Sequence, residues 1–268
     1  MRKAINLYSV NLNGRTKEKI MAIKEAGFDS IYTGIYNKAE DMPLDDIIAM
    51  FKAEGFFIPQ MHCSYYEPNL KYLWQDGQLG DEQENDLKQQ IIQTAGYEIE
   101  NFVLHTNGEF NPPKTQTGIE RIKRMLEVAE KYNVNLCIEN LYDIDQMKYI
   151  FNHIESDKLK VCYDCGHHNC LNNETDLFNI FKDKITVLHL HDNFGKVPNV
   201  TGDLHKMLGE GNIDLDKLAM HIAQLPQDIA LCAEYKVSKD QYSKEFFVKA
   251  KKTLDVFENK IELQRNLK

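Results

Sequence analysis

Short apolar runs alternate with longer amphipathic segments along the whole chain. The apolar runs are five to eight residues of Val, Ile, Leu, Phe, Tyr and Cys with little charge, which is typical of strands buried on both faces of a parallel sheet. These predicted strands are residues 4–10, 30–35, 56–63, 101–106, 134–140, 160–164, 185–191 and 228–235. Between them, apolar residues recur every three or four positions, which predicts helices. The predicted helices are residues 16–26, 43–54, 81–99, 118–132, 143–154, 176–181, 214–225 and 242–267.

Eight strands and eight helices in strict alternation predict a fold of the α/β class. Alternation of this kind requires parallel strands, and eight such units close naturally into a barrel. A doubly wound open sheet is the main competitor, but it usually carries a Gly-rich GxGxxG loop after an early strand, and the chain has none. We therefore predict a single (β/α)8 TIM barrel domain over residues 1–268.

Composition and charge narrow the expected partners. The chain is 43% hydrophobic and 27% charged, close to the average of globular domains. Lys and Arg number 32 against 41 Asp and Glu, a formal net charge of −9, which repels anionic polymers at long range. We therefore do not expect nucleic acid or membrane as a partner. Neither a signal peptide nor a bilayer-spanning apolar stretch is visible, so we expect a cytoplasmic protein.

The six cysteines are expected to be free thiols. Four of them lie in or beside apolar runs, where a thiol behaves as a small hydrophobic group. The alternative is a zinc knuckle formed by Cys162, Cys165 and Cys170. That spacing lacks a fourth thiolate nearby and is weak support for a zinc site.

The active site of a (β/α)8 barrel lies at the carboxyl ends of its strands. Six consecutive predicted strands deliver a His, Asp or Glu there: His62, His105, Glu139, Asp164, His189 and Glu234. A polar side chain of these types is costly to bury unless it is paired or bound. Each one alone could be a histidine beside the core or a carboxylate paired with a lysine. Together they indicate a shared cation.

We predict that the cation is a divalent metal ion held by Glu139, Asp164, His189 and Glu234. Three carboxylates within several ångströms would otherwise raise one another's pKa strongly. The mixture of imidazole and carboxylate ligands suits Mn²⁺, Zn²⁺, Co²⁺ or Fe²⁺, whereas Mg²⁺ fits less well.

The other histidines differ in their expected roles. His167 stands three residues beyond Asp164 and can reach the site. His205, two residues after Asp203, lies in a glycine-punctuated loop that would overhang it. His191 could point into the barrel or towards the helices. The remaining three are expected to be structural or on the surface: His153, His168 and His221.

Five motifs in the second half resemble those of the xylose-isomerase-like TIM barrels. They are CIEN at Glu139, YDCGHH at Asp164, HLHD from His189, LGEGNID from Leu208 and AEY at Glu234. That superfamily includes sugar and sugar phosphate isomerases and epimerases, inosose dehydratases, hydroxypyruvate isomerase and the endonuclease IV proteins. The resemblance implies a carbohydrate substrate and the four-ligand metal site given above. Barrels of this type often form homodimers through their helix layer, but the sequence does not fix the oligomeric state.

The resemblance further implies isomerisation or epimerisation of a sugar or sugar phosphate through a metal-stabilised enediolate. Glu139 and Glu234 would act as base and acid, and His167 would steady the developing oxyanion. Three further histidines would contact the substrate: His62, His105 and His205. Four aromatic residues could line the sugar site or simply pack under loops: Tyr65, Tyr66, Trp74 and Tyr235.

Two positions depart from the sugar-enzyme pattern. Ketose 3-epimerases carry an arginine six residues after the metal-binding histidine, whereas this chain has Gly195 there, followed by Lys196. Common sugar isomerases carry H-x-K-D at the seventh strand, and His191 stands at the lysine position. A ketohexose epimerase activity is therefore in doubt.

The endonuclease IV branch implies a different chemistry, a phosphodiesterase with three zinc ions. All nine of its ligand positions are matched: His62, His105, Glu139, Asp164, His167, His189, Asp203, His205 and Glu234. The local context differs, since His168 and Asn169 follow His167 where the nucleases have small residues. A third possibility is a non-catalytic barrel that kept the fold and the metal. One ion per chain favours the isomerase, three favour the nuclease, and none favours the third reading.

Overall fold

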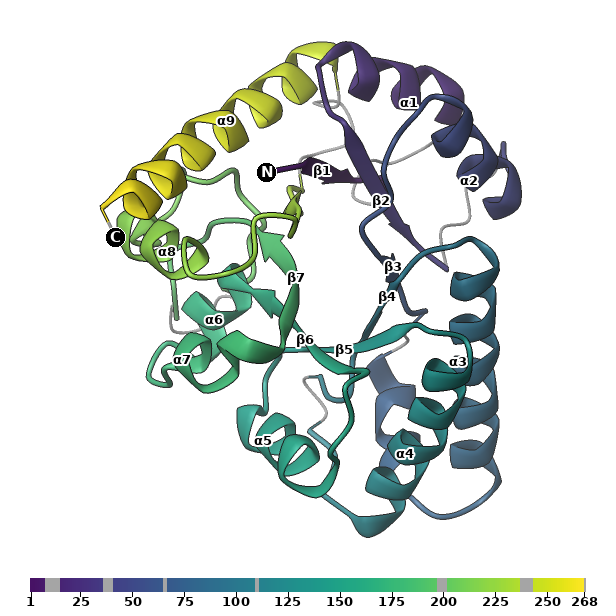
Figure 1. The fold of residues 1–268 in the computed structure, drawn as a ribbon. Helices are drawn as coiled ribbons and strands as arrows, with labels where there is room; N and C mark the ends of the chain where they lie inside the picture. The colour runs from purple at the N-terminus through teal and green to yellow at the C-terminus, as the bar shows by residue number, and fades with distance from the viewer. Residues whose placement is uncertain are drawn as a thin grey trace.

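The structure is a computed structural model that describes residues 1–7, 15–35, 41–64, 67–108, 111–196, 202–236 and 243–267, without the side chains of residues 67 and 68. Eight parallel strands pair in chain order, and the last pairs with the first, so that they close into a barrel (Figure 1). They are β1 Lys3–Asn6, β2 Ser30–Gly34, β3 Met61–His62, β4 Asn101–Leu104, β5 Asn135–Glu139, β6 Leu159–Asp164, β7 Ile185–Leu190 and β8 Leu231–Ala233. The predicted TIM barrel of the α/β class is confirmed.

The observed strands are mostly shorter than the apolar runs that predicted them. The largest difference is at β3, where residues 56–63 were predicted and two residues are paired. Phe57 forms only an isolated bridge with Ser30. Pro59 follows two residues later and has no N–H to donate to a strand ladder, which explains the interruption. Residues 8–10 of the first predicted strand lie outside the described residues.

An outer ring of helices surrounds the barrel (Figure 1). The described α-helices are α1 Thr16–Glu25, α2 Leu44–Ala53, α3 Gln78–Gly96, α4 Gln116–Lys131, α5 Ile144–His153, α6 Cys165–Leu171, α7 Leu177–Phe181, α8 Leu215–Ile222 and α9 Lys244–Asn266. Two 3₁₀ helices are also present, η1 Glu67–Trp74 and η2 Lys182–Lys184. The long α9 packs against both α8 and α1 and so completes the ring.

The prediction of one helix between the sixth and seventh strands was wrong. Two helices, α6 and α7, occupy that connection. Helix α6 begins directly after β6, and the side chain of Asp164 accepts a hydrogen bond from the backbone N–H of His167 at 2.7 Å. Its sequence CGHHNCL has no clear apolar periodicity, which is why the pattern did not reveal it.

The helices bury one apolar face each against the strands. On α4, Ile119, Ile122 and Met125 are fully buried, as their three-residue spacing predicts. Burying such a side chain contributes about 1.5–3 kcal/mol. All six cysteines are free and buried, so they pack as part of the interior. Among the described helices, none is long and apolar enough to cross a bilayer.

Candidate metal centre

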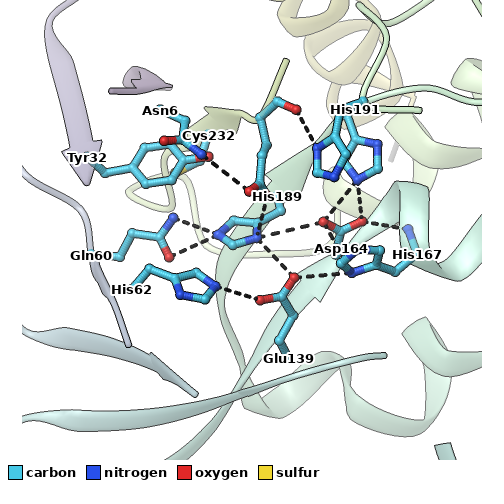
Figure 2. Close-up of polar contacts among 12 residues, drawn as sticks. Asn6, Tyr32, Gln60, His62, Glu139, Asp164, His167, His189, His191 and Cys232 are labelled. Atoms are coloured by element: carbon cyan, nitrogen blue, oxygen red, sulfur yellow. Dashed lines mark hydrogen bonds and ion pairs between the residues drawn. The ribbon is translucent and has the colours of Figure 1, made fainter. Parts of the chain in front are cut away.

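Buried acidic and imidazole side chains converge at the carboxyl ends of the strands (Figure 2). They form three groups in which one potential ligand atom from each residue lies within 4.8 Å of the others, and Cys162 forms a fourth such group with Glu139 and His189. We call the first three the outer group (His62, His105, Glu139), the central group (Glu139, Asp164, His189, Glu234) and the loop group (His167, His191, Asp203, His205). The structure therefore brings together every His, Asp and Glu for which a site role was predicted and adds His191.

The outer group joins the ends of β3, β4 and β5. The Nε2 atoms of His62 and His105 lie 3.1 Å apart. Each also faces Oε2 of Glu139, at 3.3 Å from His62 and 2.9 Å from His105. Three ligand atoms thus form a compact triangle.

The central group uses the other oxygen of Glu139. Oε1 of Glu139 lies 3.3 Å from Nδ1 of His189. The same nitrogen lies 2.9 Å from Oε2 of Glu234 and 3.7 Å from Oδ2 of Asp164. Glu139 therefore belongs to two groups and offers one carboxylate oxygen to each.

The loop group sits beside the central group and is completed by the connection after β7. Nε2 of His205 lies 2.9 Å from Oδ2 of Asp203, and Nε2 of His167 lies 3.6 Å from the same oxygen. The other ring nitrogen of His167, Nδ1, faces the central group at 3.2 Å from Oε1 of Glu139. His205 is held by its Nδ1, which donates to the backbone oxygen of Glu234 at 2.8 Å.

The electrostatics of the site balance buried carboxylates against imidazolium groups. Burial opposes ionisation of Glu139, but the neighbouring imidazoles of His189 and His105 hold its pKa well below the usual range. Burial likewise opposes protonation of His62, but hydrogen bonds to the side chains of Cys63 and Glu139 raise its pKa to about 10. Divalent ions would replace such protons as the compensating charge, because metal ligands must be deprotonated.

Gln60 supports the central group and was not predicted from the sequence. Its side-chain amide lies beside Nε2 of His189, with Nε2 of Gln60 at 2.7 Å and Oε1 at 3.1 Å (Figure 2). In the tautomer that carries its proton on Nε2, His189 donates to the amide oxygen of Gln60 and leaves Nδ1 bare for an ion. Tyr32 stacks on the same imidazole, with ring centroids 5.7 Å apart. Gln60 precedes His62 by two residues, and that spacing was the available signal.

Asp192 anchors the loop that carries Asp203 and His205. Its carboxylate accepts hydrogen bonds from the backbone N–H groups of Asn193, Gly209 and Ile213 at 2.9, 2.8 and 3.2 Å. Its own backbone pairs with Lys206 in both directions. The backbone and side chain of Asp192 together thus hold residues 206, 209 and 213 at the end of β7.

The remaining polar and aromatic predictions have mixed outcomes. His168 is hydrogen-bonded to Tyr163 and Thr175, His221 stacks on Phe178, and His153 is exposed, in agreement with structural or surface roles. Trp74 and Tyr235 are buried in the core, which favours packing over a role in lining a sugar site. Tyr65 and Tyr66 lie outside the described residues.

Comparison with known proteins gives a family match over most of the chain. A family model described as xylose isomerase-like TIM barrel matches residues 20–258. The chain is similar to "Probable endonuclease 4" of Mycoplasma pneumoniae, with 32% identity over 146 residues that cover 46% of this chain and 49% of the relative. It is also similar to an uncharacterised protein of Sinorhizobium fredii, with 27% identity over 152 residues, 51% of this chain and 47% of the relative. The matches thus span about half the length of these curated relatives.

Solved structures share the fold at low identity. A D-tagatose 3-epimerase-like protein superposes with a TM-score of 0.79 and 18% identity, covering 98% of this chain and 99% of the other. An IOLI protein with a bound zinc atom gives 0.77 and 18%, covering 96% and 98%. A D-psicose 3-epimerase of Clostridium cellulolyticum gives 0.76 and 12%, covering 97% and 99%.

Proposed function

The chain belongs to the xylose isomerase-like TIM barrel family, and on that premise we propose that it is a metal-dependent phosphodiesterase whose centre holds three divalent ions. The observation that carries the proposal is the division of Glu139 between two groups, one oxygen to each. A single-ion enzyme needs only the central group. It would leave the outer and loop groups, with five buried histidines, without a function.

The distances within each group fit a metal ion. An ion with bonds of about 2.0–2.1 Å and tetrahedral angles separates its ligand atoms by about 3.3 Å. Neighbouring ligand atoms lie 2.9–3.3 Å apart in the outer group and 2.9–3.7 Å apart around His189 in the central group. Imidazole nitrogen and carboxylate oxygen together favour Zn²⁺, Mn²⁺ or Co²⁺ over Mg²⁺.

Charge favours three ions if the substrate is a phosphate ester. The groups contain four carboxylates, those of Glu139, Asp164, Asp203 and Glu234, with a formal charge of −4. One divalent ion gives −4 + 2 = −2, which repels a phosphate. Three give −4 + 6 = +2, which attracts it. In this arrangement His62, His105 and His205 would hold ions rather than contact the substrate directly.

The chain's own residues would orient the reacting groups. Bound in these groups, divalent ions would polarise a phosphate oxygen and lower the pKa of a water molecule. Glu139 holds two of the positions at a fixed separation, and Gln60 and Tyr32 fix the ring of His189. The only support for a nucleic-acid substrate among these observations is the similarity to the endonuclease 4 relative.

A second candidate is the sugar or sugar phosphate isomerase or epimerase predicted from the sequence. The central group is by itself a four-ligand site, and sugar epimerases are among the structures with the same fold. Glu139 and Glu234 would then move a proton at the carbon beside a carbonyl, and His167 would contact substrate oxygens. Glu234→Gln would abolish that turnover and leave the fold intact.

One comparison separates the two candidates. Protein loaded with Zn²⁺ or Mn²⁺ is assayed on bis(p-nitrophenyl) phosphate, on a DNA duplex with one abasic site, and on a panel of ketoses, aldoses and their phosphates. The proposal expects cleavage of a phosphodiester that is lost in His105→Ala and kept in the exposed control His153→Ala. Sugar interconversion without phosphodiester cleavage, unaffected by His105→Ala, would overturn it.

A further inference from the structure

His191 occupies a place in the site that the nine matched positions do not include. Its side chain is fully buried, and its Nε2 atom lies 3.0 Å from Oδ1 of Asp164 (Figure 2). The same atom lies 3.7 Å from Oδ1 of Asp203. The ring stacks on that of His205, with centroids 3.9 Å apart and planes 14° apart. The imidazole is therefore directed into the loop group.

The backbone opposite this ring leaves room for it. Gly166 in α6 faces the imidazole, and a Cβ atom built there would lie 1.9 Å from Cε1 and 2.2 Å from Nδ1 of His191. Any side chain at position 166 would displace the ring. Among the described residues Nδ1 of His191 has no hydrogen-bond partner, so the polar contacts of this buried ring are all made by Nε2.

We propose that His191 is a fourth protein ligand in the loop group, so that the ion there is enclosed by His167, His191, Asp203 and His205. One ligand atom from each residue lies within 4.8 Å of the others. Oδ2 of Asp203 lies 2.9 Å from Nε2 of His205 and 3.6 Å from Nε2 of His167, and Oδ1 of Asp203 lies 3.7 Å from Nε2 of His191. These values bracket the edge of about 3.3 Å expected for a tetrahedral site. The inference rests on the proposed three-ion centre.

A loop-group ion with four protein ligands would have a different role from an ion with three. Four protein ligands are typical of structural zinc, whereas catalytic zinc keeps three and an open position. The loop group would therefore fasten the loop around Asp203 and His205 to the barrel. The outer group has three protein ligands, so its ion is the one with a position open to a phosphate oxygen.

The direct test is a crystal structure of the Zn²⁺-loaded protein with anomalous data at the zinc edge. We expect three peaks, one of them about 2.0–2.1 Å from Nε2 of His191. Three peaks with His191 more than 3 Å from each would overturn this inference and leave the proposed function standing. A single peak in the central group would overturn both.

A variant gives a second measurement. His191→Asn should weaken the binding of one of three Zn²⁺ ions by at least about 100-fold in chelator competition followed by native mass spectrometry, since loss of a residue that only supports a ligand costs about 10–100-fold. The other two ions should keep their affinities, and His153→Asn serves as the matched control. Unchanged affinity of all three ions in His191→Asn would contradict the assignment.

Discussion

Oε2 of Glu139 lies 2.9 Å from Nε2 of His105, while its other oxygen, Oε1, is turned away from that ring towards the central group. A carboxylate that serves one ion has no need to divide its oxygens between imidazoles on opposite sides. The division makes Glu139 the bridge between the outer and central groups.

Removing the amide of Gln60 should weaken the central group without touching a ligand. In Gln60→Ala, His189 loses the partner at Nε2 that fixes its ring and proton. Loss of such a supporting hydrogen bond lowers metal affinity by about 10–100-fold. Zn²⁺ affinity is measured by chelator competition, with the exposed Gln93→Ala as control. Equal affinities in the two variants would show that Gln60 has no such role.

Removing the carboxylate of Asp192 should weaken ion binding in the loop group and leave ion binding in the outer and central groups unchanged. Asp192→Ala leaves three backbone N–H groups without their acceptor. The one on Asn193 belongs to a buried residue, and a buried group left unsatisfied costs about 1–3 kcal/mol. We expect a lower melting temperature and loss of the loop-group ion, with the outer and central ions retained. Native mass spectrometry of this variant and of the exposed control Asp145→Ala measures the difference. Retention of all ions by Asp192→Ala would mean that the loop is held by other contacts.

The metal-free protein should lose stability as the pH rises from 6.5 to 8.5. The folded pKa of His62, about 10, exceeds its unfolded value of about 6.5, so the stabilisation is complete below 6.5 and disappears as the pH approaches 10. Each such proton contributes up to about 1.4 kcal/mol per pH unit. The raised pKa values of His167 and His189 act in the same direction.

Thermal unfolding with a chelator at several pH values measures this loss. His62→Asn should flatten the profile, because it removes one of the protons concerned. Excess Zn²⁺ should reverse the trend, since binding releases protons and strengthens as the pH rises. A melting temperature of the metal-free protein that is constant or rises from pH 6.5 to 8.5 would contradict the assigned protonation.

The amino-acid sequence predicts the fold and the residues of the site. It does not predict how those residues divide into the outer, central and loop groups. Buried apolar runs locate all eight strands, and the rule that barrel sites lie at strand ends selects Glu139, Asp164 and His189. The pattern of apolar residues fails to predict element boundaries where other effects determine them. Pro59 shortens β3, and helix α6 depends on capping by Asp164 rather than on apolar periodicity.

The direction of single side chains was also beyond the sequence pattern. Residues two apart on a strand share a face, so His191 follows His189 into the barrel, but only the space beside Gly166 allows its ring to remain there. The splitting of the Glu139 oxygens depends on the positions of imidazoles from three other strands. Spacing along one strand does not encode such a relationship.

The number of divalent ions per chain tests the central claim most directly. Native mass spectrometry is applied to protein purified without chelator and saturated with Zn²⁺, together with Glu139→Gln and the exposed control Glu127→Gln. We predict three ions in the unmodified protein and in Glu127→Gln, and loss of the outer and central ions in Glu139→Gln. A single ion in the saturated protein, or three ions retained by Glu139→Gln, would contradict a centre bridged by Glu139.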